Sequence, residues 1–464
     1  MKKDFNLLNK TIHFVGVGGS GMIALAQYMR SKGRCKVTGS DLRHTTALLE
    51  LKNQSVKVYQ GHHEDHVKDA HVVVVSTAIP LDNCEVVYAK KKKKKIFSRG
   101  EFLAFLMKDY DRQVALVGTH GKTTSTGMLV HVMDWAGIIP SFMVGGELPP
   151  YFVNGRFSES STFVTESDES DGSFLHLNPN FAIVTNIEPE HLNYYQSEEK
   201  LYEAFHTFLS SFKKKDKLLI INKDNARCMK MVKDIKPPKC FTLSLHDADA
   251  DFLASNINYS STGMTYDVIH GGENLGTVSM SLFGEHNVYN SLGVVILALQ
   301  LGIGFETIKK GLSGFQGVKR RMQLISELSG ISIYDDYGHH PTEVKTTLEG
   351  VKTALDRPVT CVFQPHRFSR IKDLLADFYS AFKTVDQLVL TTIYAANEDE
   401  EEGLIERLLD GIKEHSLPNV VFLQSLEDIL DHLKSTLNQG DVLVTMGAGD
   451  VHEVSTELAR HYAV

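Results

Sequence analysis

A lysine follows a glycine-rich turn in the stretch "ALVGTHGKTT", residues 115–124. In such a turn the ammonium of Lys122 can reach the β- and γ-phosphates of a nucleotide, and the Thr123 hydroxyl can bind Mg²⁺. The usual P-loop has a glycine five positions before Gly121, where this sequence has Leu116. The stretch predicts a phosphate-binding loop, and it leaves open whether this is an altered P-loop, an accidental turn or a loop built for another reaction.

A second glycine-rich stretch, "GVGGSG" at Gly16–Gly21, follows an apolar run and precedes a helical pattern. Glycines at this spacing let the backbone approach a pyrophosphate, whose charge then meets the N-terminus of a helix. The first ligand to consider is NAD or FAD, with Asp41 about 20 residues further on as the ribose carboxylate. The alternative is that the glycines serve only a tight turn. Two such loops together predict two phosphorylated ligands.

Carboxylates are concentrated in two stretches, "VTESDESD" and "VTNIEPEHLNYY", each after a predicted strand. Mg²⁺ prefers hard oxygen ligands, so acidic side chains at strand ends near a phosphate loop are candidates to bind it. The candidates are Glu166, Asp168, Glu169, Asp171, Glu188, Glu190 and His191. Each of them alone is as well explained by a solvated strand end.

Arginines and histidines gather later in the chain, in "DDYGHHP" and "FQPHRFSR". Arg367 and Arg370 are three positions apart, and His339, His340 and His366 lie in the same two motifs. A guanidinium binds a carboxylate or a phosphate through two parallel hydrogen bonds. The motifs predict an anion site, against the alternative of a solvated basic helix start.

The elements that must position these residues alternate between short apolar runs and helical patterns. Strands are predicted at 11–17, 35–41 and 71–80, with a helix at 22–32, and the pattern restarts near residue 109. Residues 251–283 have the polar alternation of antiparallel hairpins, and a third block of strands and helices follows residue 316. Alternating strands and helices predict parallel sheets whose ligands bind at the carboxyl ends of the strands.

The composition excludes several classes of protein. The net charge of −8 argues against a general nucleic-acid binder, and the run Lys90–Lys95 is better explained as a solvated helix end than as a binding patch. The five cysteines form no metal or disulfide spacing, which favours reduced thiols. The start of the sequence has no signal-peptide core and no stretch is long enough to span a bilayer, so we expect a cytoplasmic protein without membrane partners.

Nine stretches in order along the chain resemble the Mur ligases of peptidoglycan synthesis: "HFVGVGGSGM", "TGSD", "GTHGKTT", "ESDESD", "TNIEPEHLNYY", "GEHNVYNSL", "DDYGHHPTEV", "FQPHRFSR" and "TMGAGD". The resemblance also accounts for Leu116, because the family's loop has the form G-T-x-G-K-T/S. It implies an α/β fold of three domains. These are a Rossmann-like UDP-sugar domain (1–108), a central P-loop ATPase-like ATP domain with an antiparallel β extension (109–316), and a C-terminal Rossmann-like amino-acid domain (317–464).

The resemblance also implies roles for individual residues. The UDP-sugar set is Gly18, Gly19, Ser20, Gly21, Ser40, Asp41 and Ser76. The ATP set is Gly118, Thr119, His120, Gly121, Lys122, Thr123, Thr124, His286, Asn287, Asn290, Arg321 and Asp336. The metal set is Thr123, Glu166 and His191, and the amino-acid set is His339, Arg367 and Arg370. Lys122, His191, His339, Arg367 and Arg370 are the catalytic set, and the choices Arg320 or Arg321 and His339 or His340 stay open.

The implied activity is an ATP-dependent amide ligation in cytoplasmic peptidoglycan precursor synthesis, with Mg²⁺ or Mn²⁺ as the metal. "FQPHRFSR" resembles the branch that adds L-alanine to UDP-N-acetylmuramate through an acyl phosphate. The alternative inside the family is the murein-recycling ligase that attaches a tripeptide to the same UDP-sugar. Outside it, an NAD-dependent oxidoreductase and a non-catalytic UDP-sugar binder are the other hypotheses. The expected partners are small molecules, and the oligomeric state is left open.

Overall fold

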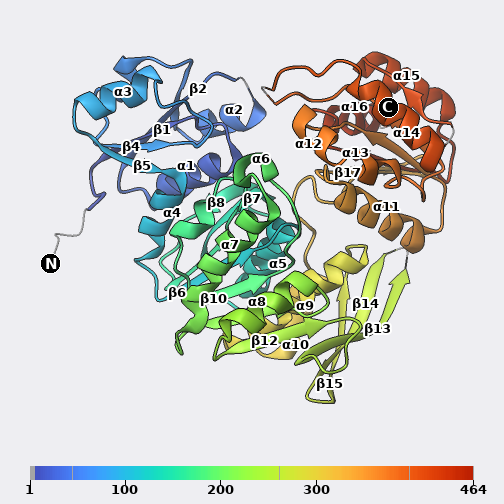
Figure 1. The fold of residues 1–464 in the computed structure, drawn as a ribbon, viewed down its shortest axis with the longest axis horizontal. Helices are drawn as coiled ribbons and strands as arrows, with labels where there is room; N and C mark the ends of the chain where they lie inside the picture. Colours follow the sequence, from blue (N-terminus) through green and yellow to red (C-terminus); the bar gives the residue numbers. More distant parts are fainter. Residues whose placement is uncertain (1–5, 44, 261, 397, 418, 463–464) are drawn as a thin grey trace. The chain divides into compact units, whose positions relative to one another are not determined.

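The computed structural model describes residues 6–43, 45–260, 262–396, 398–417 and 419–462. Three β-sheets with flanking helices follow one another along the chain (Figure 1). The predicted α/β class with three sheet-containing regions is therefore confirmed. By their internal contacts the residues form two compact units: one comprises Met1–Ser255, Val268–Gly276 and Tyr289–Leu312, and the other comprises Asn256–Asp267, Thr277–Val288 and Ser313–Val464.

The N-terminal sheet has five strands in the order β3-β2-β1-β4-β5, all parallel. Its strands are β1 (Thr11–Val15), β2 (Lys36–Asp41), β3 (Lys57–Gln60), β4 (Val72–Val75) and β5 (Lys95–Ser98). The connecting helices are α1 (Ser20–Lys32), α2 (Thr46–Asn53), α3 (Cys84–Lys91) and α4 (Arg99–Met107). The strand order reverses between β1 and β4, which is where ligands bind in sheets of this type.

The central sheet runs in the order β15-β14-β13-β12-β11-β10-β6-β9-β7-β8. Its first seven strands along the chain are β6 (Arg112–Val117), β7 (Ser141–Leu148), β8 (Val153–Arg156), β9 (Thr162–Glu166), β10 (Phe181–Val184), β11 (Leu218–Asn222) and β12 (Cys240–Ser244). The helices of this region are α5 (Lys122–Trp135), α6 (Leu192–Tyr195), α7 (Glu198–Leu209), α8 (Ala226–Ile235), α9 (Glu285–Gln300) and α10 (Phe305–Ser313). Only β8 pairs antiparallel among the strands from β6 to β12, so the loops after β6, β9 and β10 leave the same edge.

The predicted extension is present as β13 (Phe252–Ser260), β14 (Gly263–His270) and β15 (Glu273–Met280). The connection between β14 and β15 is Gly271–Gly272, both with positive φ (57° and 83°). A two-residue connection between neighbouring strands requires an antiparallel hairpin, and two positive φ values suit glycine.

The first two sheets share one hydrophobic core, which the sequence did not lead us to expect. Helix α1 is buried from Met22 to Met29, and its Gln27 side chain accepts hydrogen bonds from the backbone N–H groups of Asn154 (2.7 Å) and Gly155 (3.2 Å) on β8. A methyl group on Gly155 would overlap the backbone of α1 at Ala24. One apolar cluster accordingly extends from β1 and α1 into β6, β9, β10 and α7.

The C-terminal sheet has the order β16-β17-β21-β18-β19-β20. Its strands are β16 (Gln323–Leu328), β17 (Ile331–Asp336), β18 (Val359–Phe363), β19 (Gln387–Leu390), β20 (Val421–Phe422) and β21 (Val442–Met446). Its helices are α11 (Pro341–Leu355), α12 (Phe368–Asp373), α13 (Leu375–Tyr379), α14 (Leu404–His415), α15 (Leu426–Thr436) and α16 (His452–Tyr462). All pairs are parallel except β16 with β17, an antiparallel edge strand that the sequence pattern did not reveal.

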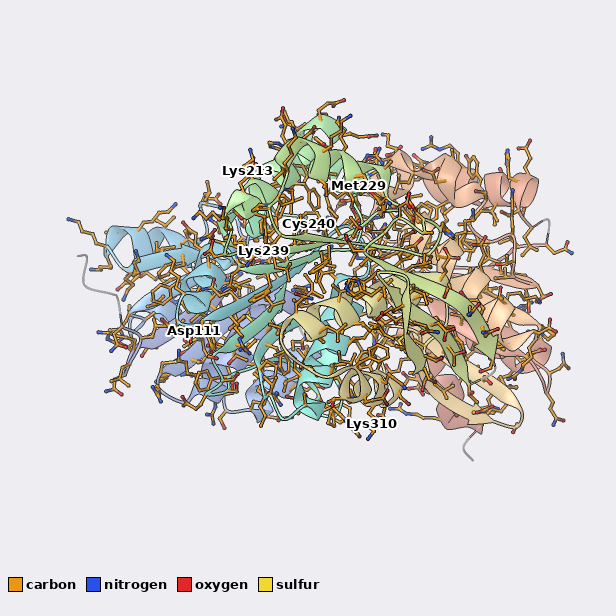
Figure 2. All side chains as sticks on the ribbon, turned by 90° about the horizontal axis from the view of Figure 1, so that it is seen from below. Asp111, Lys213, Met229, Lys239, Cys240 and Lys310 are labelled. Carbon is orange, nitrogen blue, oxygen red and sulfur yellow. The ribbon has the colours of Figure 1, made fainter. Side chains whose placement is uncertain are left out.

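The lysine run, the cysteines and the helices can each be compared with the expectations from composition. Lys213 and Lys310 are exposed (Figure 2), and within the run Lys90–Lys95 only Lys94 is half-buried, donating to the carbonyls of Lys68 and Ala70 at 2.7 Å. All five cysteines are free thiols. Among the described residues, none of the helices combines the length and apolar character that crossing a bilayer requires.

Candidate active site

The first glycine loop connects β1 to α1. Gly16 has a φ of 76°, and Gly19 caps α1 without a side-chain hydrogen bond. A methyl group on Gly19 would meet no atom within 4 Å, so the space beside this residue is open. The first backbone N–H groups of a helix have no partner inside the helix and favour a phosphate there.

Asp41 and Ser76, both in the predicted UDP-sugar set, lie against this loop. Asp41 Oδ2 accepts a hydrogen bond from Gly18 N at 2.8 Å, and its Oδ1 accepts from the backbone and side chain of Arg43 at 3.0 and 3.2 Å. Burial opposes ionisation of Asp41, but these hydrogen bonds hold its pKa below the usual value. Ser76 lies beneath the turn, where its Cβ would be 3.0 Å from a methyl group on Gly16.

The side chain of Ser40 points away from the loop, whereas its backbone carbonyl accepts hydrogen bonds from Gly16 N (2.9 Å) and Val17 N (3.0 Å). Its place in the UDP-sugar set stays a prediction. Its side chain is fully buried, and Oγ donates to Glu85 Oε2 at 2.6 Å. Successive residues of a strand point to opposite faces, so Asp41 reaches the loop while Ser40 points inside. Glu85 is also hydrogen-bonded to Nδ1 of His66 (2.7 Å) and of His62 (3.1 Å). Ser40 therefore belongs to a buried polar cluster behind the loop.

The second glycine loop connects β6 to α5. Leu116 is fully buried in β6 and pairs with Ile183 and Glu166 on the neighbouring strands, so its position belongs to the strand rather than to the loop. Gly118 (φ 132°) and Gly121 (φ 82°) have positive φ. A methyl group on Gly118 would clash with Thr185 and lie 2.8 Å from Asn186 O, so this loop is tightly enclosed by protein.

Lys122 is held at the start of α5 by several acceptors. Its Nζ donates to Gly118 O (2.6 Å), Thr119 O (3.0 Å) and Glu169 Oε2 (2.8 Å), and it lies 3.9 Å from Asp168 Oδ1. Burial alone would lower the pKa of Lys122, but the neighbouring carboxylates raise it above the usual value. The loop thus presents a fixed positive charge where a phosphate chain would lie.

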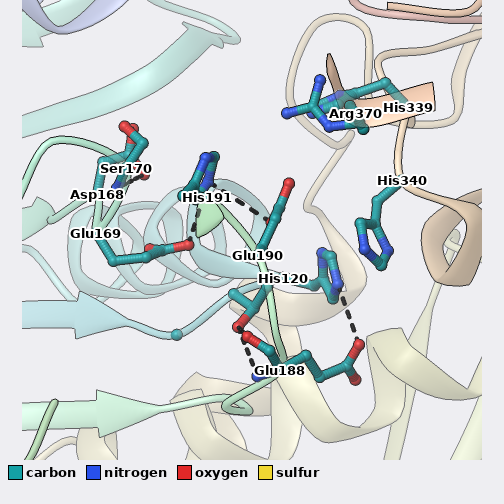
Figure 3. A network of polar contacts seen from close by, with 12 residues as sticks. His120, Asp168, Glu169, Ser170, Glu188, Glu190, His191, His339, His340 and Arg370 are labelled. Carbon is teal, nitrogen blue, oxygen red and sulfur yellow. Dashed lines mark hydrogen bonds and ion pairs between the residues drawn. The ribbon is translucent and has the colours of Figure 1, made fainter. Parts of the chain in front are cut away.

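His191 lies beside one carboxylate of the loop after β9 and one of its own loop after β10 (Figure 3). Its Nε2 is 3.7 Å from Glu169 Oε1 and 3.7 Å from Glu190 Oε2. Ligand atoms of Asp168, Glu169 and His191 lie within 4.8 Å of one another, close enough to share one cation. Lys122 Nζ lies close to Asp168 and Glu169, so these two carboxylates already neutralise the ammonium charge of Lys122.

Thr123 and Glu166, the other two residues of the predicted metal set, lie together beside Gly145 of β7. A methyl group on Gly145 would clash with Glu166 Oε1 and lie 3.3 Å from Thr123 Oγ1. A hydroxyl and a carboxylate are ligand types that Mg²⁺ accepts, so the donor set suits this ion.

The remaining loop residues pack closely around the second glycine turn. His120 Nε2 lies 3.3 Å from Glu188 Oε2 (Figure 3). Thr119 Oγ1 accepts a hydrogen bond from Glu188 N at 2.8 Å. Thr124 is buried. Asn290 of α9 is also beside the loop, since a methyl group on Gly121 would clash with its Oδ1.

His286 and Asn287 lie in the first turn of α9. A methyl group on Gly284 would lie 2.6 Å from His286 Cε1, so the ring folds back on the preceding loop. The side chain of Asn287 is buried, and its Nδ2 donates to Phe283 O at 2.7 Å. Their predicted role at the adenine therefore stays a prediction.

In the C-terminal unit, Arg320 and Arg321 flank the ring of Tyr337 at 5.0 and 5.3 Å. Arg320 forms hydrogen bonds within this unit, donating to Asp335 Oδ2 (3.2 Å) and Gly447 O (2.7 Å). Arg321 Nη1 lies 3.8 Å from Glu343 Oε1. Asp336 is buried and accepts hydrogen bonds from Met322 N and Gly338 N. Burial raises the pKa of Asp336 to about 6.

The residues predicted to bind the amino acid come together at the carboxyl ends of β17 and β18. The rings of His339 and His366 are 5.6 Å apart, and Arg370 Nη1 is 3.1 Å from His366 Nδ1. Burial lowers the pKa of His366 to about 2, so the ring stays neutral among cationic neighbours. Arg367 has a φ of 68°, a strained conformation typical of functional sites. His340 instead caps α11, accepting from Thr342 N at 3.3 Å.

Two features were missed by reasoning from the sequence. Glu169 was one of several acidic candidates, and nothing in the motif singled it out as the partner of Lys122. Arg99, the first residue of α4, forms a two-pronged ion pair with Asp171, with Nη2 2.8 Å from both carboxylate oxygens. No local pattern marks Arg99, and its partner is 72 positions away.

Family models match three consecutive segments of the chain. Residues 11–111 match the Mur ligase family, catalytic domain; residues 116–298 match the Mur ligase middle domain; and residues 320–449 match the Mur ligase, glutamate ligase domain.

Curated relatives and solved structures are similar over nearly the whole chain. The UDP-N-acetylmuramate–L-alanine ligase of Geobacter sp. (strain M21) is 40% identical over 445 residues, covering 96% of this chain and 95% of the relative. That of Myxococcus xanthus is 38% identical over 448 residues, covering 96% and 94%. The structure of UDP-N-acetylmuramate-alanine ligase MurC from Thermotoga maritima has a TM-score of 0.85 at 25% identity, covering 98% and 99%. A murein peptide ligase from Psychrobacter arcticus has a TM-score of 0.71 at 25% identity, covering 97% and 98%.

Proposed function

The chain belongs to the Mur ligase family, and from that premise we propose that it joins L-alanine to UDP-N-acetylmuramate with hydrolysis of ATP to ADP. The observation that carries the proposal is the position of Lys122, fixed in a phosphate loop and surrounded by Asp168, Glu169 and His191. This is an arrangement suited to phosphoryl transfer, and the chain is similar to alanine ligases over nearly its full length.

The chemical problem is that a carboxylate is a poor electrophile. In the first step an oxygen of the sugar's lactyl carboxylate attacks the γ-phosphorus of ATP, the bond to ADP breaks, and an acyl phosphate forms. Lys122 neutralises the charge that develops on the transferred group, a task that needs a positioned cation rather than covalent chemistry. The contacts of Lys122 with Gly118 O and Thr119 O keep its ammonium at the loop throughout.

We assign the metal to Thr123, Glu166 and His191. Mg²⁺ at this position would have oxygen ligands from Thr123 and Glu166 and a ring nitrogen from His191, and it would supply further neutralisation of phosphate charge. Glu169 Oε1, a buried oxygen with no hydrogen bond to a described residue, provides another acceptor near His191.

In the second step the neutral amine of L-alanine attacks the acyl carbon, the carbon–oxygen bond to phosphate breaks, and the nitrogen loses a proton. Arg367 and Arg370 hold the alanine carboxylate through charge-assisted hydrogen bonds, and His339 lies beside them. The neutral state of His366 leaves these cations available to a carboxylate.

The substrate assignments follow the three sheets. We assign the UDP-sugar to residues 1–108, ATP to 109–316 and the amino acid to 317–464, with Arg321 and Asp336 contacting ATP and with His286, Asn287 and Asn290 at the adenine. Because ATP and UDP-sugars are intracellular metabolites, we place the enzyme in the cytoplasm.

Isotope transfer tests this function. With UDP-N-acetylmuramate labelled with ¹⁸O in its carboxylate, one labelled oxygen should leave in inorganic phosphate, and phosphate release should require all three substrates. Unlabelled phosphate would exclude the acyl phosphate. A panel of amino acids and the tripeptide L-alanyl-γ-D-glutamyl-meso-diaminopimelate then separates the alternatives, since preferential use of the tripeptide would identify a recycling ligase.

A further inference from the structure

Arg99 connects the first glycine loop to the acidic loop that positions Lys122. It is the first residue of α4, directly after β5. Its guanidinium packs on the first turn of α1, where a methyl group on Gly21 would lie 2.7 Å from Arg99 Nη1 and 3.5 Å from Cζ. The charge of Arg99 therefore lies at the helix N-terminus that the glycine loop prepares for an anion.

The other edge of the guanidinium is fixed by Asp171. Arg99 Nε is 3.2 Å from Asp171 Oδ2, and Nη2 is 2.8 Å from both carboxylate oxygens. Thr77 Oγ1 and Ser173 N also donate to Asp171, each at 3.0 Å. Both side chains are largely buried, with 16% of Arg99 and 12% of Asp171 exposed.

Nη1 differs from the other two nitrogens. Nε and Nη2 are used by Asp171, whereas Nη1 donates to no acceptor among the residues that the structure describes. Burial alone would lower the pKa of Arg99, but Asp171, Asp168 and Glu166 raise it, so the group stays charged. A charged nitrogen of a largely buried side chain that faces a glycine turn and lacks an acceptor among the described residues has the chemistry of an anion ligand.

Asp171 also belongs to the loop that holds Lys122. Glu169, two positions earlier, accepts from Lys122 Nζ at 2.8 Å, and Gly172 N donates to Glu169 O at 2.9 Å within the same turn. One short acidic loop therefore contacts a cation at each of the two phosphate sites.

We propose that Arg99 binds the diphosphate of the UDP-sugar through Nη1, and that Asp171 is a positioning residue that orients Arg99 from the acidic loop. The inference rests on the proposed function for the identity of the nucleotide. It adds a side-chain ligand to a loop that otherwise offers backbone N–H groups.

The test compares the binding of UDP and of uridine by calorimetry, without turnover. Arg99→Lys keeps the positive charge but removes the planar guanidinium with its paired N–H donors. In this variant UDP should bind about tenfold or more weakly. Uridine, which has no phosphate, should bind as in the wild type. Equal losses for UDP and uridine would indicate a structural role and overturn the proposal. Unchanged UDP binding would overturn it as well.

A second ion pair in the same unit serves as the control. Arg156 Nη2 lies 3.1 Å from Asp134 Oδ1, with side-chain exposures of 19% and 15%. Arg156→Lys should lower thermal stability to a similar degree as Arg99→Lys and leave UDP binding unchanged. If Arg156→Lys weakened UDP binding equally, the effect of Arg99→Lys would be non-specific and the proposal would fail.

Asp171→Asn tests the positioning role. It should weaken UDP binding by a few-fold and uridine binding not at all, and it should add little in the Arg99→Lys background, because both changes disturb one interaction. Independent, additive losses would overturn the positioning role. These experiments stay separate from the ligase assay: loss of label transfer would refute the proposed function, whereas phosphate-specific UDP binding through Arg99 would still stand.

Discussion

The two glycine loops occupy equivalent places, each between a buried strand and a helix, but they use opposite electrostatics. In the first, a carboxylate of Asp41 accepts from Gly18 N, and the cations beside the loop, Arg43 and Arg99, come from other parts of the chain. In the second, Lys122 belongs to the loop itself and is held by Glu169. Under the proposed function both strand–glycine–helix turns bind phosphate, and the loops differ in whether the cation belongs to the turn itself or is supplied from elsewhere in the chain.

The loops also differ in the space around their glycines. Gly19 has open space beside it, whereas Gly118 and Gly121 are enclosed by Thr185, Asn186 and Asn290. In the first loop, small residues leave room for a ligand. In the second loop, Gly118 and Gly121 are required because neighbouring protein atoms leave no room for a side chain.

Of the substitutions that test the difference between the two loops, Lys122→Ala should have the largest effect. Removing the cation of the second loop should lower the rate of phosphate release about 10³-fold or more, because a preorganised charge at the transferred group is lost. Steady-state assays with all three substrates measure this. Lys223→Ala, which removes a lysine paired with Asp247 at 2.8 Å, should leave the rate unchanged; an equal loss there would contradict the special role of Lys122.

Glycine-to-alanine changes test the difference in space. Gly118→Ala should reduce the free energy of unfolding by about 4 kcal/mol, from the clash and the positive φ together. Gly19→Ala should change it by less than about 0.5 kcal/mol while weakening UDP binding. Urea denaturation followed by circular dichroism measures both. Equal stabilities of the two variants would show that the loops are packed alike.

Acid should act on the buried cluster behind the first loop. Burial alone would raise the pKa of Glu85, but His13, whose Nε2 is 3.7 Å from Glu85 Oε2, and the hydrogen bond from Ser40 lower it to about 2. A carboxyl whose pKa is lowered in the folded state stabilises above its unfolded pKa, so about 3 kcal/mol should be lost as pH falls from about 4.3 towards 2. His13, whose pKa is lowered by burial, acts in the same direction below about pH 6.5.

Urea titrations at a series of acidic pH values check this prediction. Glu85→Gln should be less stable at neutral pH and should show a flatter dependence in this window. Glu64→Gln, a change at an exposed residue, should follow the wild type. A wild-type slope in Glu85→Gln would assign the acid sensitivity to another group.

The smallest effect is expected at Asp41. Asp41→Ala removes the acceptor of Gly18 N and should cost about 1 kcal/mol of stability, whereas Asp41→Asn keeps an acceptor oxygen and should cost less. Denaturant midpoints distinguish the two. If both variants matched the wild type, Asp41 would not organise the first loop.

Local features could be predicted from the sequence, and long-range ones could not. The two loops, Lys122 and the arginine-histidine motifs were found because strand, turn and helix signals lie within a few residues. The burial of the Ser40 side chain could not be predicted, because a sequence shows that a strand ends but does not show which face a given residue takes. The Arg99–Asp171 pair and the contact of Gln27 with Asn154 depend on residues that are far apart in the chain and form no pattern of their own.

The shared core of the first two sheets has a consequence for selectivity. Because α1 is packed directly on β8, the distance between the N-termini of α1 and α5 is fixed by the shared core. This fixed distance limits which substrates can reach from one phosphate site to the other. A sugar nucleotide gripped by its diphosphate at one end can present a carboxylate to the γ-phosphate only if the intervening sugar has the matching length. Sugar nucleotides of another length would bind but would not react. The enzyme would therefore select its substrate by length before the nature of the reacting group matters.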